Sequence, residues 1–168
     1  MRPQAGSGNL GGVDPNLTLG EIDNRSSARV EHIRTALATV QVTVHVPEDI
    51  QAWLWWKFVG AATLGGLVAV ARVPTGVWRQ IPQVRVMVER AAQEVVAVAR
   101  ARGIHPSADV IEQIQRVIDA VPPGHITSMH EEIIGGRPSE LEYWSGAVVR
   151  LGREVGVATP IGANLSIE

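Results

Sequence analysis

The chain has 168 residues, 45% of them hydrophobic, so it can bury one sizeable core, or one domain with a small appendage. Its 15 basic and 17 acidic residues give a formal net charge of -2, which leaves no excess positive charge for phosphate contacts. We therefore expect neither nucleic acid nor an anionic membrane surface as a partner. Because cysteine is absent, disulfides and thiolate chemistry are excluded, and a cytoplasmic location is expected.

The N-terminal segment MRPQAGSGNLGG contains a formal G-x-G-x-x-G match that begins at Gly6. A dinucleotide site needs a strand that runs into the glycine turn and a helix whose amides receive the pyrophosphate. Only five residues precede Gly6, and Gly12 to Pro15 cannot open a regular helix. We therefore expect residues 1–16 to be a flexible glycine-rich terminus. The segment also lacks the apolar core of a signal peptide, so export is not expected.

Residues 17–46 carry the pattern of a strand, a helix and a second strand. Leu17 to Gly20 predicts a short strand, and Ser27 is placed to cap a helix. The apolar residues expected on one face of that helix are Val30, Ile33, Leu37 and Val40. Valines then alternate with other residues from Val40 to Val46, which indicates a strand. This segment is too short to form a whole sheet.

The segment from Ala52 to Ala71 carries a single charged residue, Lys57. Its length and apolar character suit a membrane span, and its tryptophans are typical of an interfacial anchor. Two features favour instead a helix that is buried on all its sides within a soluble bundle. They are the glycines of the segment and the amphipathic helices elsewhere, which need an apolar partner. We adopt the buried helix, with the membrane span as the alternative.

Three further helices are indicated by apolar residues at steps of three and four. Their predicted stripes are Val84, Val88, Ala91, Val95 and Val98; Val110, Ile111, Ile114, Val117 and Ile118; and Leu141, Trp144, Val148, Leu151 and Val155. Ser107 is expected to cap the second helix, and the capping-box pair Ser139 and Glu142 to start the third, which puts Glu140 in its first turn. A short helix is expected over 126–134, and Gly156 should end the last helix. The predicted fold class is mainly α, a multi-helix bundle.

Lys57 is the first candidate site residue, because a lysine within an apolar helix either reaches outward to solvent or is held at a site. Trp53 and Ala61 share its helix face. Desolvation would lower the pKa of the amine toward a value that suits protonation of a nascent alkoxide, and a carboxylate partner would oppose that shift. The alternative is a solvent-reaching lysine whose stem packs on tryptophan.

Glu140 and Ser128 are weaker candidates. A carboxylate in the first turn of a helix stays ionised and can accept a hydrogen bond from a substrate hydroxyl or a lysine, but acidic residues also favour that position for helix stability alone. Ser128 either binds a substrate carboxylate or packs in a helix. The five histidines form no i, i+4 pair and no H-E-x-x-H motif, so no metal site is expected.

The stretch ITSMHEEIIGGRPSELEYWSGAVVRLGREVGVATP, together with Lys57, resembles the C-terminal half of the ketopantoate reductases. The W-x-K signature of that family falls on Trp55 and Lys57, its serine before methionine on Ser128, and its G-R-x-x-E on the segment from Gly136 to Glu140. The match continues through Gly146, Ala147, Val148, Val149, Arg150, Gly152, Gly156 and Pro160. The segment LTLGEIDNRSSARVEHIRTAL is similar to the end of the nucleotide-binding domain of the family.

The resemblance implies an NADPH-dependent reduction of 2-dehydropantoate, or of a related 2-keto acid, to the 2-hydroxy acid. It implies that Lys57 polarises the ketone and donates the proton. Ser128 and Glu140 would hold oxygens of the substrate, and Glu140 would also lie near the cofactor ribose. Many members carry asparagines one and two helical turns after the lysine. In this chain those positions are Ala61 and Gly65. The resemblance therefore leaves open which 2-keto acid is the substrate.

The resemblance also implies a domain organisation, because it covers nearly the whole chain but about half of a family member. We interpret residues 17–50 as the remnant of a Rossmann-like nucleotide-binding domain and residues 51–168 as an all-α substrate and dimerisation domain. Without the cofactor cradle, this portion should be inactive alone and need a separate nucleotide-binding domain. The alternative hypothesis is a non-catalytic helical module for dimerisation or ligand binding. A homodimer is expected under both, because five tryptophans and the apolar helices exceed what a small bundle buries.

Overall fold

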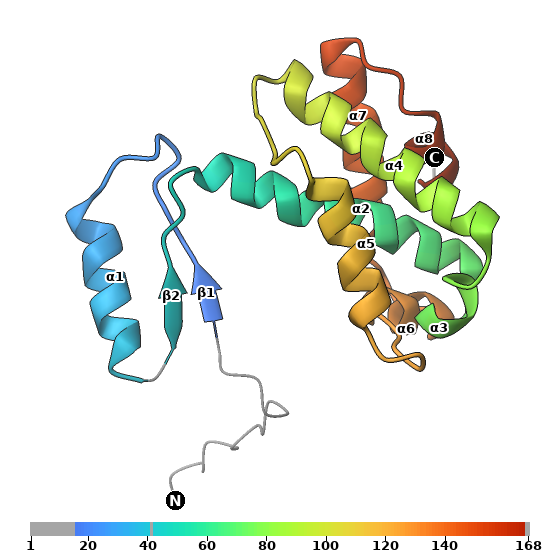
Figure 1. Ribbon diagram of the computed structural model, residues 1–168, viewed down its shortest axis with the longest axis horizontal. Coiled ribbons are helices and arrows are strands. Elements are labelled where there is room, and N and C mark those ends of the chain that lie inside the picture. The colour runs from blue at the N-terminus through green and yellow to red at the C-terminus, as the bar shows by residue number, and fades with distance from the viewer. Residues whose placement is uncertain (1–15, 41, 167–168) are drawn as a thin grey trace, which may run out of the picture. The chain divides into compact units, whose positions relative to one another are not determined.

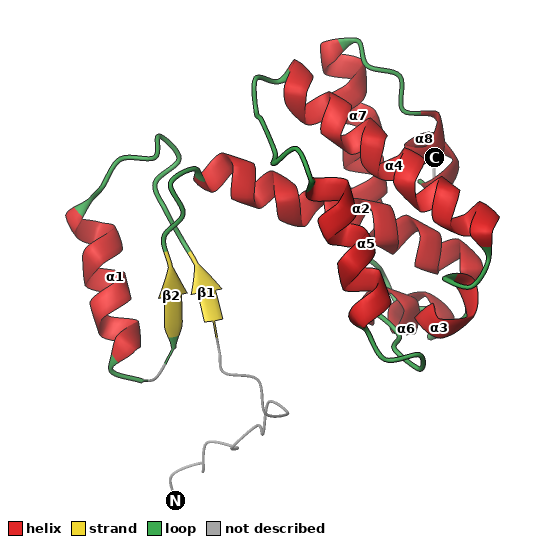
Figure 2. Cartoon of the chain, viewed as in Figure 1, coloured by secondary structure: helices red, strands yellow, loops and turns green. Residues whose placement is uncertain are grey.

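The structure is a computed structural model that describes residues 16–40 and 42–166. The formal glycine motif at Gly6, and nearly all of the flexible terminus expected over 1–16, lie outside these residues. The chain divides into two compact units between Ile50 and Gln51. Figure 1 labels the α-helices and strands of both units, and Figure 2 shows that the described strands belong to the first unit.

The first unit contains the expected strand, helix and strand. Strand β1 (Asn16–Thr18) is followed by α1 (Ala28–Ala38) and β2 (Thr43–His45), and the two strands pair in parallel. Ser27 caps α1 as predicted, because its side chain accepts a hydrogen bond from the amide of Val30 at 3.1 Å. The predicted apolar face of α1 is wrong in part. Val30 is buried within the unit, but Ile33 is 41% exposed and Val40 is 63% exposed.

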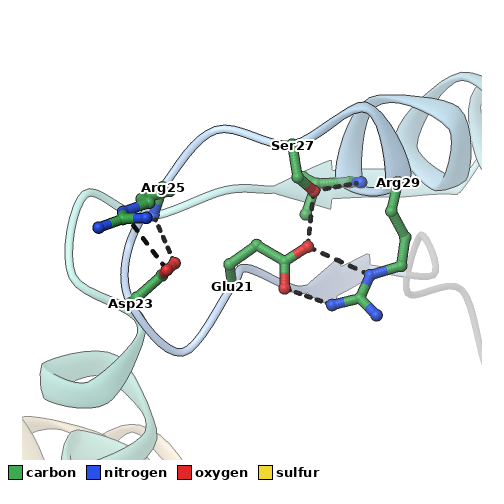
Figure 3. Close-up of polar contacts among 6 residues, drawn as sticks. Glu21, Asp23, Arg25, Ser27 and Arg29 are labelled. Carbon is green, nitrogen blue, oxygen red and sulfur yellow. Dashed lines mark hydrogen bonds and ion pairs between the residues drawn. The ribbon is translucent and has the colours of Figure 1, made fainter.

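A polar network closes the N-terminal end of α1 (Figure 3). The Glu21 carboxylate accepts hydrogen bonds from the Ser27 hydroxyl at 2.6 Å and from Arg29 Nε at 3.1 Å. The hydrogen bonds from Arg29 and then Ser27 lower the pKa of Glu21. The folded unit therefore favours the ionised carboxylate, and this contribution is present at neutral pH and is lost as the pH falls through the lowered pKa. Beside this network, Asp23 pairs with Arg25.

The second unit is the mainly helical bundle that the sequence predicts, which confirms the fold class. Its elements are α2 (Ile50–Ala71, from the last residue of the first unit), α3 (Thr75–Trp78), α4 (Pro82–Ala101), α5 (Val110–Ala120), α6 (Ser128–Ile134), the π-helical turn η1 (Glu142–Gly146), α7 (Ala147–Val155) and α8 (Pro160–Leu165). Most of the predicted stripes of α4 and α5 face the core, where Val88, Val98 and Ile114 are each at most 3% exposed. Val117, also placed on the stripe of α5, is 46% exposed. Gly156 ends α7 with φ 69°, the left-handed conformation that favours glycine at this position.

Helix α2 contributes Val59, Ala62 and Leu67 to the main apolar cluster, but it is not buried on all sides. Leu54 is 47% exposed and Lys57 is exposed, so the prediction of a fully buried helix is wrong. Two neighbouring glycines of α2 lie very close to side chains of other elements. A Cβ on Gly66 would lie 2.6 Å from Ser145 Oγ, and one on Gly65 would lie 2.9 Å from Met129 Cε. Among the described helices, none is long and apolar enough to cross a membrane.

Two predicted helix starts are wrong. Helix α5 begins at Val110 rather than after Ser107, because the intervening residues form a turn in which the amide of Val110 donates to the Ser107 carbonyl at 3.1 Å. The last long helix begins at Leu141 rather than Ser139. Glu140 therefore precedes the helix, and its carbonyl accepts the first hydrogen bond, from the amide of Trp144 at 3.0 Å. The five-residue π turn that follows is a feature the 3.6-residue period does not predict.

Helix α8, which the periodicity did not predict, is held by a side chain from α4. Glu94 Oε1 accepts from the amide of Ile161 at 2.8 Å, and Oε2 accepts from the amide of Gly162 at 2.9 Å. A half-buried carboxylate that binds two helix N-terminal amides should stabilise the bundle appreciably.

We expect Glu94→Ala to lower the free energy of unfolding by about 2 kcal/mol in urea denaturation, and Glu94→Gln to lower it less. Glu89→Ala, on an exposed position of the same helix, is the control, and a Glu94→Ala variant as stable as that control would contradict this role.

Candidate functional site

A cavity of about 350 Å³ in the second unit brings together residues from α2, α5, α6 and the start of the last long helix. All three site residues predicted from the sequence line it: Lys57 on α2, Ser128 at the first position of α6, and Glu140 immediately before Leu141. These residues are far apart in the chain. Their convergence on one cavity is therefore a property of the bundle rather than of a local motif.

Lys57 contributes an available cation to this cavity. It is the only lysine of the 168-residue sequence. Within the part of the chain that the structure describes, its ammonium makes no hydrogen bond and no ion pair. Lys57 is exposed to solvent. The expectation that the apolar segment desolvates its ammonium is therefore wrong. The same helix face carries Ala61 and Leu64, four and seven residues further on, and both line the cavity.

Glu140 is exposed and is fixed by one side-chain contact. Its Oε2 accepts a hydrogen bond from the indole Nε1 of Trp144 at 3.2 Å. Lys57 and Glu140 line the same cavity, but within the described residues no ion pair joins them. An ammonium and a carboxylate that share a cavity without neutralising each other can both bind a ligand placed between them.

Ser128 reaches the cavity because α6 begins at that residue. The hydroxyl of Thr127 caps the helix by accepting from the amide of His130 at 3.2 Å. Ser128 itself is exposed, and within the described residues its hydroxyl has no hydrogen-bond partner. The site therefore offers one ammonium, one carboxylate and one free hydroxyl to a bound molecule.

The rest of the lining is apolar, and most of it escaped prediction from the sequence. Trp56 and Trp144 contribute rings, Ile114 and Val117 come from α5, and Met129 comes from α6. Helical spacing from Lys57 finds the residues on α2. Nothing in the sequence links that face to α5, because the pairing depends on contacts such as the hydrogen bond from Trp56 Nε1 to Gln113 Oε1 at 2.6 Å.

The described residues of the first unit do not fit the phosphates of a nicotinamide cofactor. A helix N-terminus can hold a phosphate when its amides and nearby cations are free. Here Ser27 caps the amide of Val30, and the Glu21 carboxylate, which would repel a phosphate, lies against Ser27. The nearby Arg29 is paired with Glu21. Glu140, the one cofactor contact predicted from the resemblance, lines the cavity of the second unit.

The second unit is thus a helical bundle in which Lys57, Ser128 and Glu140 line one largely apolar cavity. The family model described as "Ketopantoate reductase PanE/ApbA C terminal" matches residues 49–165. The chain belongs to this family, whose members are oxidoreductases.

Individual relatives agree with this assignment. A 2-dehydropantoate 2-reductase of Pyrobaculum aerophilum is 31% identical over 122 residues, which are 73% of this chain and 43% of the relative. One of Halobacterium salinarum is 30% identical over 144 residues, which are 86% of this chain and 47% of the relative. The chain thus spans less than half the length of these curated relatives.

Solved structures share the fold. A dimeric ketopantoate reductase of Staphylococcus aureus superposes with a TM-score of 0.81 at 22% identity, over 91% of this chain and 52% of that one. A D-mandelate dehydrogenase in complex with NADH and anilino(oxo)acetate superposes with a TM-score of 0.80 at 24% identity, over 89% of this chain and 63% of that one. At these identities the likeness concerns the fold alone.

Proposed function

We propose that this chain forms the substrate side of an NADPH-dependent reductase that converts 2-dehydropantoate, or a related 2-oxo acid, to the 2-hydroxy acid. The observation that carries the proposal is the unpaired Lys57 ammonium, which lines one cavity with Ser128 and Glu140. A 2-oxo acid presents a carboxylate and a ketone oxygen side by side, and both accept hydrogen bonds from such donors. Membership of the ketopantoate reductase family supports this chemistry.

A reduced nicotinamide, when bound, would supply the hydride that the carbonyl carbon needs. The Lys57 ammonium donates a hydrogen bond to the ketone oxygen, which stabilises the negative charge that develops there, and transfers a proton to the alkoxide. Ser128 donates a hydrogen bond to the substrate carboxylate. Glu140 accepts one from the hydroxyl of the product and, by the family resemblance, from the ribose of the cofactor.

We propose further that the first unit is the end of a Rossmann-like domain and that segments other than the described ones hold the cofactor phosphates. The parallel pairing of β1 and β2 across α1 supports this, because parallel strands joined by a helix are the repeating unit of such domains. A homodimer is part of the proposal, supported by the dimeric reductase of Staphylococcus aureus.

Substrate binding to the purified chain tests the proposal without the cofactor. Trp56 and Trp144 line the cavity, so a 2-oxo acid should change tryptophan fluorescence saturably. Ser128→Ala should weaken that binding by about fivefold, the equivalent of one neutral hydrogen bond. Ser26→Ala, an exposed serine of the first unit, is the control and should leave the affinity unchanged. Absence of saturable binding, or an affinity that both variants leave unchanged, would count against the proposed role.

A further inference from the structure

We infer that the substrate carries an apolar side chain, branched or aromatic, in place of the hydroxyl-bearing side chain of 2-dehydropantoate. This inference rests on the proposed function and specifies its substrate class. It follows from the part of the cavity that lies beyond the three polar side chains assigned to the oxo-acid group.

The wall that α2 contributes has no hydrogen-bonding side chain after Lys57. The lining residues of that helix are then Gly60, Ala61, Leu64 and Gly65. A Cβ on Gly60 would meet only Ile114 Cγ1, at 3.9 Å, so the space above that glycine is open. The space above Gly65 is filled by the end of the Met129 side chain. This wall therefore offers a substrate room and apolar contact, but no partner for a hydroxyl.

The two tryptophans of the lining also present carbon rather than free donors. The indole N–H of Trp56 is taken by Gln113 at 2.6 Å, and that of Trp144 by Glu140 at 3.2 Å. Thr127, the remaining polar residue of the lining, uses its hydroxyl oxygen to cap α6 through His130. Thr127 keeps only its O–H as a free donor, and along the α2 wall and the two tryptophan rings a hydroxyl on the substrate side chain would lose its hydration without a partner, which is unfavourable.

The available space suits a bulky side chain. The cavity of about 350 Å³ lies within the range of small-molecule sites, and a second cavity of about 110 Å³ shares Leu64, Val117 and Thr127 with it. The side chains of Trp78 and Ile118 line this second cavity. Thr75 and His125 also line this cavity, but an apolar group that passes Leu64 and Val117 would contact the side chains of Val68, Trp78, Ile118 and Val121.

A matched pair of ligands tests the inference on the full 168-residue chain. One is 2-dehydropantoate, and the other is its analogue with a methyl group in place of the hydroxyl. The two differ in one group, so the comparison isolates the side-chain end of the cavity. We expect the methyl analogue to bind roughly 10- to 100-fold more tightly in a fluorescence titration, because an apolar pocket gains affinity from the methyl group and rejects the added hydroxyl by up to about 100-fold.

A variant of the wall tests the cause. Ala61→Asn places an amide among the apolar residues and should reduce the preference for the methyl analogue by about tenfold, because the hydroxyl gains a partner. Ala97→Asn, on an exposed position of α4, is the matched control and should leave the preference unchanged. Ala61→Ser serves the same purpose if the larger amide prevents folding, which circular dichroism reports.

The outcomes separate this inference from the proposed function. If 2-dehydropantoate binds as tightly as the methyl analogue or more tightly, and both depend on Lys57, the proposed function stands and the apolar substrate class is overturned. If neither ligand binds in a Lys57-dependent way, the proposed function fails and the inference fails with it. If the methyl analogue binds more tightly than 2-dehydropantoate, and Ala61→Asn reduces that preference, the result supports both the inference and the proposed function.

Discussion

Replacement of Lys57 with methionine is expected to weaken the binding of a 2-oxo acid to this chain by roughly 10- to 150-fold, the range for loss of one hydrogen bond to a charged group. The ammonium is free of protein partners within the described residues, so its contacts are available to a ligand. Methionine keeps an unbranched apolar stem on α2 while it removes the charge. Fluorescence titration of both proteins measures the difference.

The control for this experiment removes another positive charge from the same helix region. Arg72 directly follows α2 and is exposed, and it is not part of the cavity lining. Arg72→Met should leave the affinity for the 2-oxo acid within about twofold of the wild type, since exposed charges that are separated by more than a Debye length are screened at physiological salt. Equal losses in Lys57→Met and Arg72→Met would mean that overall charge, rather than the cavity, drives binding.

Trp78→Ala should be the most destabilising single substitution that we predict. Trp78 is 2% exposed on α3 and belongs to the main apolar cluster of the bundle. Loss of a fully buried tryptophan costs about 3–5 kcal/mol, through lost transfer free energy and the cavity that remains. For a domain of this size the midpoint of thermal unfolding should fall by roughly 10 °C.

Trp78→Phe distinguishes the packing of the ring from its polar atom. The indole Nε1 of Trp78 is buried and has no hydrogen-bond partner among the described residues. Phenylalanine removes that unpaired donor while it retains most of the apolar volume, so we expect a loss of less than about 1.5 kcal/mol. If calorimetry gave the same midpoint for the alanine and phenylalanine variants, the ring would not be part of the core that the structure describes.

The helices that the sequence predicts best are those whose apolar stripes face a single core. The period of α4 holds because Val88, Val95 and Val98 all pack into one core, and a single buried face leaves a regular signal. Helix α2 has no such signal, since its glycines meet α6, η1 and α8 while Leu54 and Lys57 remain exposed. Its apolar composition therefore suggested a fully buried helix, with a membrane span as the alternative, and the fully buried helix is wrong.

The polar half of the site was predictable and the apolar half was not. Lys57, Ser128 and Glu140 stand in motifs that resemble those of a known family, and the structure brings them to one cavity. The cavity wall from α5 depends on the hydrogen bond between Trp56 and Gln113, which are 57 positions apart in the chain. The cap that Glu94 gives to α8 depends on its hydrogen bond with Gly162, 68 positions away. Such contacts arise only from tertiary packing, and no local pattern encodes them.

The most direct measurement follows the amine of Lys57 itself. Because Lys57 is the only lysine, reductive methylation with carbon-13 formaldehyde labels its Nζ and the α-amino group of the chain. Dimethylation keeps the positive charge and one N–H donor. We predict that a 2-oxo acid shifts the Lys57 methyl resonance saturably, with the same dissociation constant as the fluorescence change, and leaves the α-amino resonance in place. A Lys57 resonance that does not move while the ligand saturates the tryptophan signal would contradict the assignment of this lysine to the substrate.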